Sequence, residues 1–358
     1  MGQQGGMQSR IWITRLVDRI QHRLGLPPLV SGTITLGMVP VFLTGLVFVL
    51  ADGRLPREFL VAHLLAMGVP VVGPAAIWYW DVRVFPTFIE ESTELATNPT
   101  AVQRVGEQYK RLFSTRSWYF VVPWTALVVG LIGLNIGYFE TVGIAGFGDP
   151  AFWAYLLFAV WWGLITGIGF HGAITAVRAI RAVGDLDLQI EPLHPDGLGG
   201  LSMIGRLAIW TTMLISIGSL ALPLAFLLGT EGGYRAVVYF ATGLYIVLIA
   251  VSFGYPTVYV NRRARAIQEQ ELETRRQKIR QLQRQAANLE EADETADDTA
   301  TLAEVATRLE MQRLRDEFNE YDSVSLYPLS VGIIIRLISS LLLPLFFIFV
   351  DLFLGRLL

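Results

Sequence analysis

One arginine lies deep within an apolar stretch near the C-terminus of this 358-residue chain. Counted from Tyr327, Arg336 lies about 13 Å along a helix, where a cation costs on the order of 3 kcal/mol and is expected to face protein or water. Gly332 precedes it by four residues, and Ser339 and Ser340 follow it. This stripe predicts the lining of an aqueous path for anions. The alternative is that Arg336 reaches back to the headgroups on the cytosolic side.

A second polar segment, residues 193–201, precedes the fifth apolar stretch. It holds His194, a Pro-Asp-Gly turn at Asp196, and the pair Gly199 and Gly200, which permits close backbone approach. Backbone N–H groups there can hold an anion, and nearby carboxylates can hold a divalent cation. Those carboxylates are Asp185, Asp187, Glu191 and Asp196. The spacing matches no known ligand pattern, so the competing interpretation is a rigid turn that anchors the next helix.

Helix-kinking residues mark three candidate hinges. Gly254 and Pro256 stand where the sixth apolar stretch ends, and Pro344 lies in the last one. A proline inside a helix removes one backbone hydrogen bond and frees a carbonyl. Motion of the polar segment between these stretches can therefore act on a pore, although such kinks are also common in ordinary membrane bundles.

Several classes of chemistry find no support in the residues. Cysteine is absent, which excludes a disulfide or a thiolate zinc site, and no P-loop, HExxH pair or Gly-x-Ser-x-Gly elbow occurs. We therefore expect no enzyme activity, no cofactor and no metal. The net charge of −3 argues against a nucleic-acid partner.

Composition predicts an all-α membrane bundle. Hydrophobic residues make up 53% of the chain and charged residues 16%, against roughly 25% charged in soluble domains. Windows of about 20 apolar residues can each cross a bilayer. Seven such windows occur, at residues 30–51, 58–80, 118–139, 151–177, 207–229, 234–260 and 327–354.

Loop charges predict the orientation of these spans. Of the 28 basic residues, 23 fall on one side, four fall on the other (Arg54, Arg57, Arg235 and Arg356), and Arg336 lies within a span. The positive-inside rule then puts the N-terminus in the cytosol and the C-terminus outside. This topology resembles that of the insect chemoreceptor-type channels and is inverted relative to G-protein-coupled receptors. The resemblance is one of helix count and orientation, without a shared motif.

The polar segments complete the predicted layout. Residues 1–29 form a basic amphipathic segment, a helix on the membrane surface or a frayed tail. Residues 30–260 form six spans with cytosolic loops 81–117 and 178–206, and residues 326–358 form the seventh span and a short external end. Residues 261–325 form a cytosolic hairpin of two helices joined by an acidic turn. Its apolar seam, typical of a coiled coil, runs through Ile279, Leu282, Ala286, Leu289, Leu302, Val305, Leu309, Leu314, Phe318 and Tyr321.

These features favour an oligomeric ion channel of the cell membrane, with the last helix lining the path and the hairpin as its cytosolic anchor. The expected partners are the lipid bilayer, further copies of this chain and a cytosolic protein bound to residues 261–325. The alternative is a membrane sensor or scaffold that presents the hairpin to that protein. A secondary transporter is less favoured, because the chain shows no internal repeat and few acidic residues within the spans.

Overall fold

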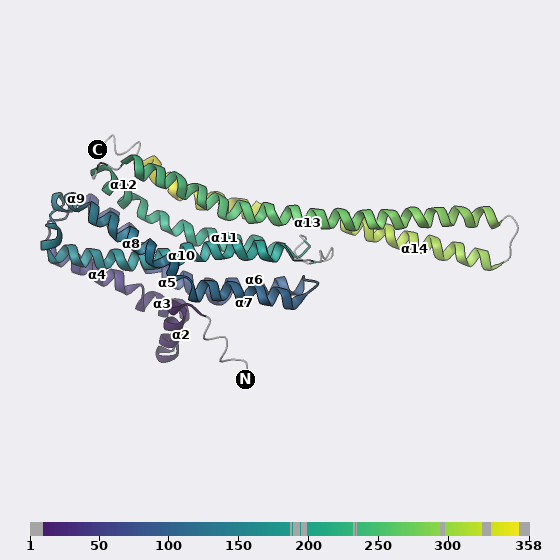
Figure 1. Cartoon of the computed structure of the whole chain (residues 1–358), viewed down its shortest axis with the longest axis horizontal. Helices are drawn as coiled ribbons and strands as arrows, with labels where there is room; N and C mark the ends of the chain where they lie inside the picture. The colour runs from purple at the N-terminus through teal and green to yellow at the C-terminus, as the bar shows by residue number, and fades with distance from the viewer. Residues whose placement is uncertain are drawn as a thin grey trace.

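The protein is built from helices that run mostly along one direction (Figure 1). The computed structural model describes residues 10–186, 188, 194, 199–231, 233, 235–293, 298–323 and 331–350. Within them, the one β contact is an isolated antiparallel bridge between Ala96 and Leu188. The elements are α2 (Trp12–Leu24), α3 (Pro28–Thr35), α4 (Met38–Leu50), α5 (Arg57–Tyr79), π-helix η1 (Trp80–Val84), α6 (Phe85–Glu94), α7 (Pro99–Thr115), α8 (Trp118–Leu134), α9 (Ile136–Thr141), 3-10 helix η2 (Gly146–Gly148), α10 (Pro150–Gly184), α11 (Ser202–Ser216), 3-10 helix η3 (Ile217–Ala221), α12 (Leu222–Glu231), α13 (Arg235–Asp293), α14 (Asp298–Ser323) and α15 (Val331–Phe349).

Six helical segments in the described residues are long and apolar enough to cross a membrane. They are Pro28–Leu50, Arg57–Glu94, Pro99–Leu134, Pro150–Gly184, Ser202–Gly229 and Arg235–Gln285, and each overlaps one of the first six predicted windows. Large apolar side chains such as Phe42 and Val49 are 71% and 76% exposed, as lipid-facing residues are. The chain is therefore a multi-span helical membrane protein. The seventh window overlaps α15, but its ends, 327–330 and 351–354, lie outside the described residues.

Local sequence explains where the helices start. Helix α7 begins after Asn98, because the Asn98 side chain accepts a hydrogen bond from the N–H of Ala101 and Pro99 occupies the first turn of α7. Asp149 and Pro150 open α10 in the same way. The bundle consequently has two different ends. The charged end carries α6, α7 and the projecting parts of α13 and α14, and the short-loop end carries α9 and η2 (Figure 1).

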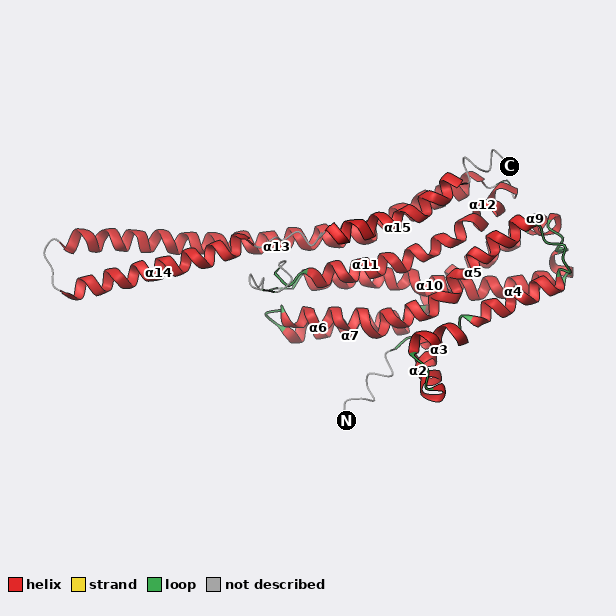
Figure 2. Cartoon of the chain, turned by 180° about the vertical axis from the view of Figure 1, so that it is seen from behind, coloured by secondary structure: helices red, strands yellow, loops and turns green. Residues whose placement is uncertain are grey.

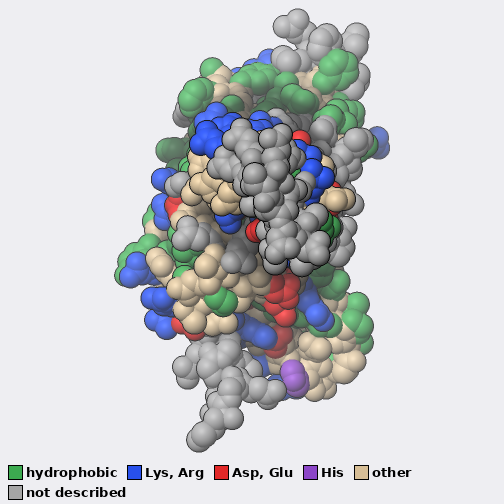
Figure 3. Space-filling model, turned by 90° about the vertical axis from the view of Figure 1, so that its right-hand side faces the viewer, with side chains coloured by type: hydrophobic (Ala, Val, Ile, Leu, Met, Phe, Trp, Pro, Cys, Tyr) green, Lys and Arg blue, Asp and Glu red, His purple; other side chains and the backbone are tan. Residues whose placement is uncertain are grey.

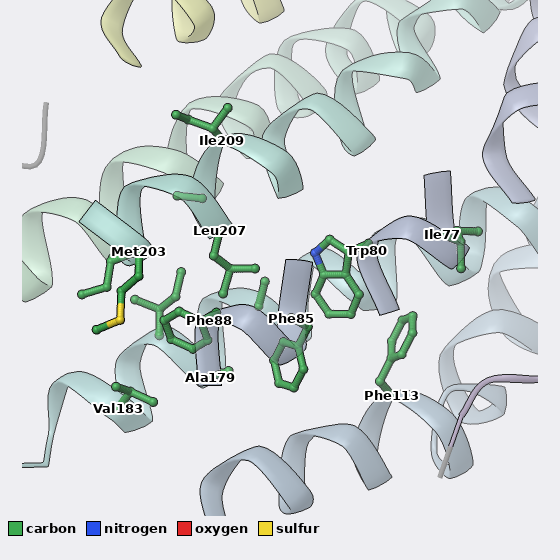
Figure 4. Close-up of a cluster of buried hydrophobic side chains, with 14 of the residues drawn as sticks. Ile77, Trp80, Phe85, Phe88, Phe113, Ala179, Val183, Met203, Leu207 and Ile209 are labelled. Carbon is green, nitrogen blue, oxygen red and sulfur yellow. The ribbon is translucent and has the colours of Figure 1, made fainter. Parts of the chain in front are cut away.

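Each end has its own buried cluster. Towards the charged end, Trp80 packs against Phe85 and Phe113, and Phe88, Met203 and Leu207 continue the cluster (Figure 4). Towards the short-loop end, a second cluster of large apolar side chains forms around Phe59 and Tyr155. The charged end is thus a packed extension of the membrane bundle and not a set of loose loops.

The basic N-terminal segment forms helix α2, which lies across the bundle (Figures 1 and 2). Its apolar residues Ile13 and Val17 are fully buried against α3 and α5, whereas Arg15 and Arg19 are exposed. Asp18 also ties α2 to α5, because its carboxylate accepts a hydrogen bond from Trp78 Nε1 at 2.9 Å. The amphipathic pattern therefore turns its apolar face to protein.

Helix α13 continues without a break through its membrane part into the charged end and beyond it. Its 59 residues correspond to about 88 Å. Helix α14 runs back along it, as both side views show (Figures 1 and 2). The Arg275 guanidinium lies 3.9 Å from the ring centre of Tyr321, and Gln268 Nε2 donates to the Tyr321 carbonyl oxygen at 2.6 Å. Viewed from this end, the surface is rich in Arg, Lys, Asp and Glu side chains (Figure 3).

Candidate functional site

Helix α15, which contains the predicted pore residues, lies at the edge of the bundle (Figure 2). It contacts α11 most extensively, then α13 and α12. Pro344 is buried in this contact. The other side of the helix exposes a stripe of large apolar side chains at helical spacing. These are Ile335, Ile338, Leu342, Leu345, Phe346 and Phe349. One side of α15 therefore carries exposed apolar side chains in the described part of this helix.

The four predicted path residues all fall on this helix. Ser339 is exposed, and its hydroxyl donates to the Ile335 carbonyl oxygen at 2.9 Å. The backbones of Gly332, Arg336 and Ser340 are helical, and their side chains lie outside the described residues. The four residues of the predicted stripe therefore belong to one continuous helix. That the Arg336 side chain faces an aqueous path stays a prediction.

The predicted hinges lie inside intact helices. Gly254 and Pro256 are both part of α13, with Pro256 buried and open space beside the Cα of Gly254. Pro344 is likewise inside α15. Two hinge candidates therefore belong to the helix that links the membrane part to α14, and the third belongs to the helix that follows α14.

The described end of the polar segment 193–201, at Gly199 and Gly200, lies next to the turn between α6 and α7. Gly200 has a left-handed φ of +88°, and a Cβ there would come within 2.5 Å of the Leu95 side chain. Gly199 is also left-handed, at φ +64°. Leu188, just before the segment, forms the bridge to Ala96. This close packing favours the interpretation of a rigid turn.

Of the four carboxylates proposed as cation ligands, Asp185 is the one that lies within the described residues. Asp185 accepts a hydrogen bond from the Tyr259 hydroxyl of α13. Asp187, Glu191 and Asp196 lie outside the described part of the chain, and His194 is half-buried. No group of three or more His, Asp or Glu side chains suited to a metal ion occurs among the residues that the structure describes.

Two buried polar clusters were not identified from the sequence. Thr44 Oγ1 and His63 Nε2 are 2.9 Å apart between α4 and α5, and both side chains are buried. Asp81, in η1, is 4% exposed and lies beside Thr14 and the backbone of Ile11 at the start of α2. A π-helix often accompanies a functional position. Spacing gives no signal for either cluster, because the partners are far apart in sequence.

A groove runs beside α15 along one face of α11. Its wider part, about 550 Å³, is lined by apolar residues of α11 and η3 and by Ser339 and Leu343 of α15. A second hollow of about 260 Å³ lies further towards the charged end, between α11 and the segment formed by α5, η1 and α6. Trp210 lines both.

Comparison with protein families, with curated proteins and with solved structures yields no match to this chain. The arrangement of α11, α13, α14 and α15 is therefore the basis for a functional proposal.

Proposed function

We propose that the protein is an oligomeric ion channel of the cell membrane in which α15 lines the path. The observation that carries this proposal is the position of α15 at the bundle edge, with an exposed stripe from Ile335 to Phe349. A helix in this position can meet the same helix of other copies around a common axis. In such an assembly we expect Arg336 to face water or a neighbouring copy, which avoids the cost of placing its charge in lipid.

The proposal includes seven spans, with α15 as the last, a cytosolic N-terminus and an external C-terminus. The charged end is then cytosolic, and α13 with α14 forms a cytosolic hairpin. The contacts of Arg275 and Gln268 with Tyr321 support its role as an anchor, because they hold α14 against the extension of α13. In this proposal, movement of α13 and α14 is transmitted to α15, which begins at Val331, soon after α14 ends at Ser323.

The test is to purify the full chain in detergent, measure its particle mass, and record currents in planar bilayers. We expect an oligomer, ionic current, and a loss of anion preference in Arg336→Ala. Arg57→Ala, which removes an exposed arginine at the start of α5, is the matched control and keeps the selectivity of the wild type. A monomer without conductance contradicts the proposal.

A scaffold that presents the hairpin to a cytosolic protein is the second candidate. The observation in its favour is that Val305 and Leu309, which continue the apolar repeat of α14, are 51% and 62% exposed. A seam left open in this way can accept another helix. Deleting residues 265–320 should leave a folded membrane domain and abolish pull-down of the partner. If the full chain captures no protein that the deletion loses, this candidate fails.

A further inference from the structure

One face of α11 and η3 carries a regular stripe of groove-lining side chains. Its spacing alternates between three and four residues, which keeps all members on one side of a helix. The members are Met203, Arg206, Trp210, Met213, Ile217 and Leu220. From Arg206 to Leu220 the stripe spans about 20 Å, somewhat more than the ~15 Å of one leaflet of the hydrocarbon core.

The end of the groove near the charged end is basic and aromatic. Arg206 is held by Glu91, with 2.8 Å between Nη2 and the carboxylate. Arg83, across the hollow, is exposed and has no ion-pair partner among the described residues. The rings of Tyr79 and Trp210 pack 4.9 Å apart beside them, as aromatic residues do at the level of lipid headgroups. Two arginines against one carboxylate leave a net positive charge here.

The rest of the groove is apolar. Trp210 and Met213 are 38% and 44% exposed, and Leu343 of α15 forms the opposite wall. The hydroxyl groups of the two lining serines already donate hydrogen bonds to the backbone, Ser216 to the Thr212 carbonyl oxygen and Ser339 to the Ile335 carbonyl oxygen. An occupant therefore does not need to accept a hydrogen bond from them. An occupant of this groove therefore needs a negative group at one end and a long apolar tail.

We propose that this groove binds one anionic phospholipid, with its phosphate at Arg83 and Arg206 and an acyl chain along α11 against α15. A free phosphate compound satisfies the basic end only and leaves the exposed apolar stripe uncovered. The length of the stripe and the position of its charge both match a lipid of the leaflet nearest the charged end. This inference does not depend on the channel proposal, because it concerns binding alone.

The test is native mass spectrometry of the full-length protein in detergent, titrated with phosphatidylglycerol or phosphatidylcholine. We expect one phosphatidylglycerol to be retained in preference to phosphatidylcholine. Arg83→Gln should raise its apparent Kd about tenfold, the value of one charge-assisted contact to phosphate. Arg104→Gln, which removes an exposed arginine of α7 outside the groove, is the matched control and should change nothing.

Two further measurements test whether binding requires the acyl chain and whether Arg83→Gln disturbs the fold. Met213→Trp, which fills the apolar part, should weaken phosphatidylglycerol binding, and excess glycerol phosphate should not displace the lipid. Arg83→Gln should keep the elution volume and melting temperature of the wild type, since Arg83 has no described ion pair to lose. Equal retention of the two lipids, an unchanged Kd in Arg83→Gln, or displacement by glycerol phosphate would overturn the proposal.

Discussion

Asp149 caps the longest helix that lies wholly within the bundle. Its carboxylate accepts hydrogen bonds from the N–H groups of Ala151 at 2.9 Å and Ala145 at 3.1 Å, and it lies 3.6 Å from the Arg54 guanidinium. Burial alone raises the pKa of this carboxyl, but the two N–H donors and Arg54 together hold the pKa below its usual value. The ionised form is therefore favoured by folding.

This cap predicts a pH-dependent contribution to stability. Because the folded pKa is lowered, the contribution is complete above the unfolded value of about 4 and is lost as the pH falls through the folded pKa. Asp149→Asn keeps a capping oxygen but removes the charge that interacts with the helix N-terminus and Arg54. It should therefore lower the free energy of unfolding at pH 7 by about 0.5–1 kcal/mol, and the difference should shrink below pH 4. Thermal unfolding in detergent across this range measures it. Asp52→Asn, in the exposed turn after α4, is the control, and an equal effect of the two variants refutes the prediction.

Gly200 supports a second prediction at the scale of single residues. Gly200→Ala combines a left-handed backbone with a contact of 2.5 Å to Leu95, whereas Gly53→Ala, at φ +70°, meets open space. Gly53→Ala should cost about 1 kcal/mol from the backbone alone. Gly200→Ala should cost more, about 2–3 kcal/mol, and adding Leu95→Ala should restore part of the loss. Equal melting temperatures of Gly200→Ala and Gly53→Ala would show that the contact with Leu95 adds no cost.

Sequence reasoning reaches only some residues of the candidate site. Arg336 was identifiable because a charge within an apolar window is rare and costly. Arg206 and Arg83 were counted only as loop charges, because their position at one hollow depends on α11 packing beside η1 and α6. His63 and Asp81 gave no signal, since their partners Thr44 and Thr14 come close only in the folded chain.

At the scale of elements, hydrophobic windows located the membrane helices well. Six windows overlap helical segments that are long and apolar enough to cross a membrane, because length and apolarity alone decide that property. The extent of the helices beyond the membrane was less predictable. The sixth span and the first helix of the hairpin were predicted as two segments that meet near residue 260, whereas α13 runs through both, from Arg235 to Asp293, without a break at Pro256. The arrangement of α6, α7 and α11 around one buried cluster also had no signature in the local periodicity.

The pairing of α13 with α14 predicts an energetic coupling between Arg275 and Tyr321. A cation held 3.9 Å from the ring centre, and largely covered, should give a coupling energy of about 0.5–1 kcal/mol in a double-mutant cycle. Hydrogen exchange of α14 amides in the wild type, Arg275→Ala, Tyr321→Ala and the double variant measures it. In the control cycle, Arg280→Ala takes the place of Arg275→Ala. It removes an exposed arginine of α13, and no coupling with Tyr321 is expected. Additive losses of stability in the cycle of Arg275→Ala and Tyr321→Ala would contradict a direct contact between the two side chains.

At the scale of the whole molecule, the chain leaves several membrane helices incompletely covered, and α15 is one of them. Helices α5, α10 and α11 form the packed centre, and α15 is added at the edge, where α11, α12 and α13 contact one side of it. The exposed side is apolar from Ile335 to Phe349, and Ser339 lies among these residues. An assembly around α15 accounts for this surface, for the long extension of α13 and for Arg336 together.

Introduced cysteines on α15 test this account most directly, because the natural chain has no cysteine to give a background reaction. Single cysteines at positions 332–346 would be treated with a charged thiol reagent during bilayer recording. We predict that modification blocks current at positions recurring every three to four residues, including 336 and 340, and leaves the intervening positions unaffected. Current that persists after modification at every position, or no current from any assembly, would contradict the claim that α15 lines an ion path.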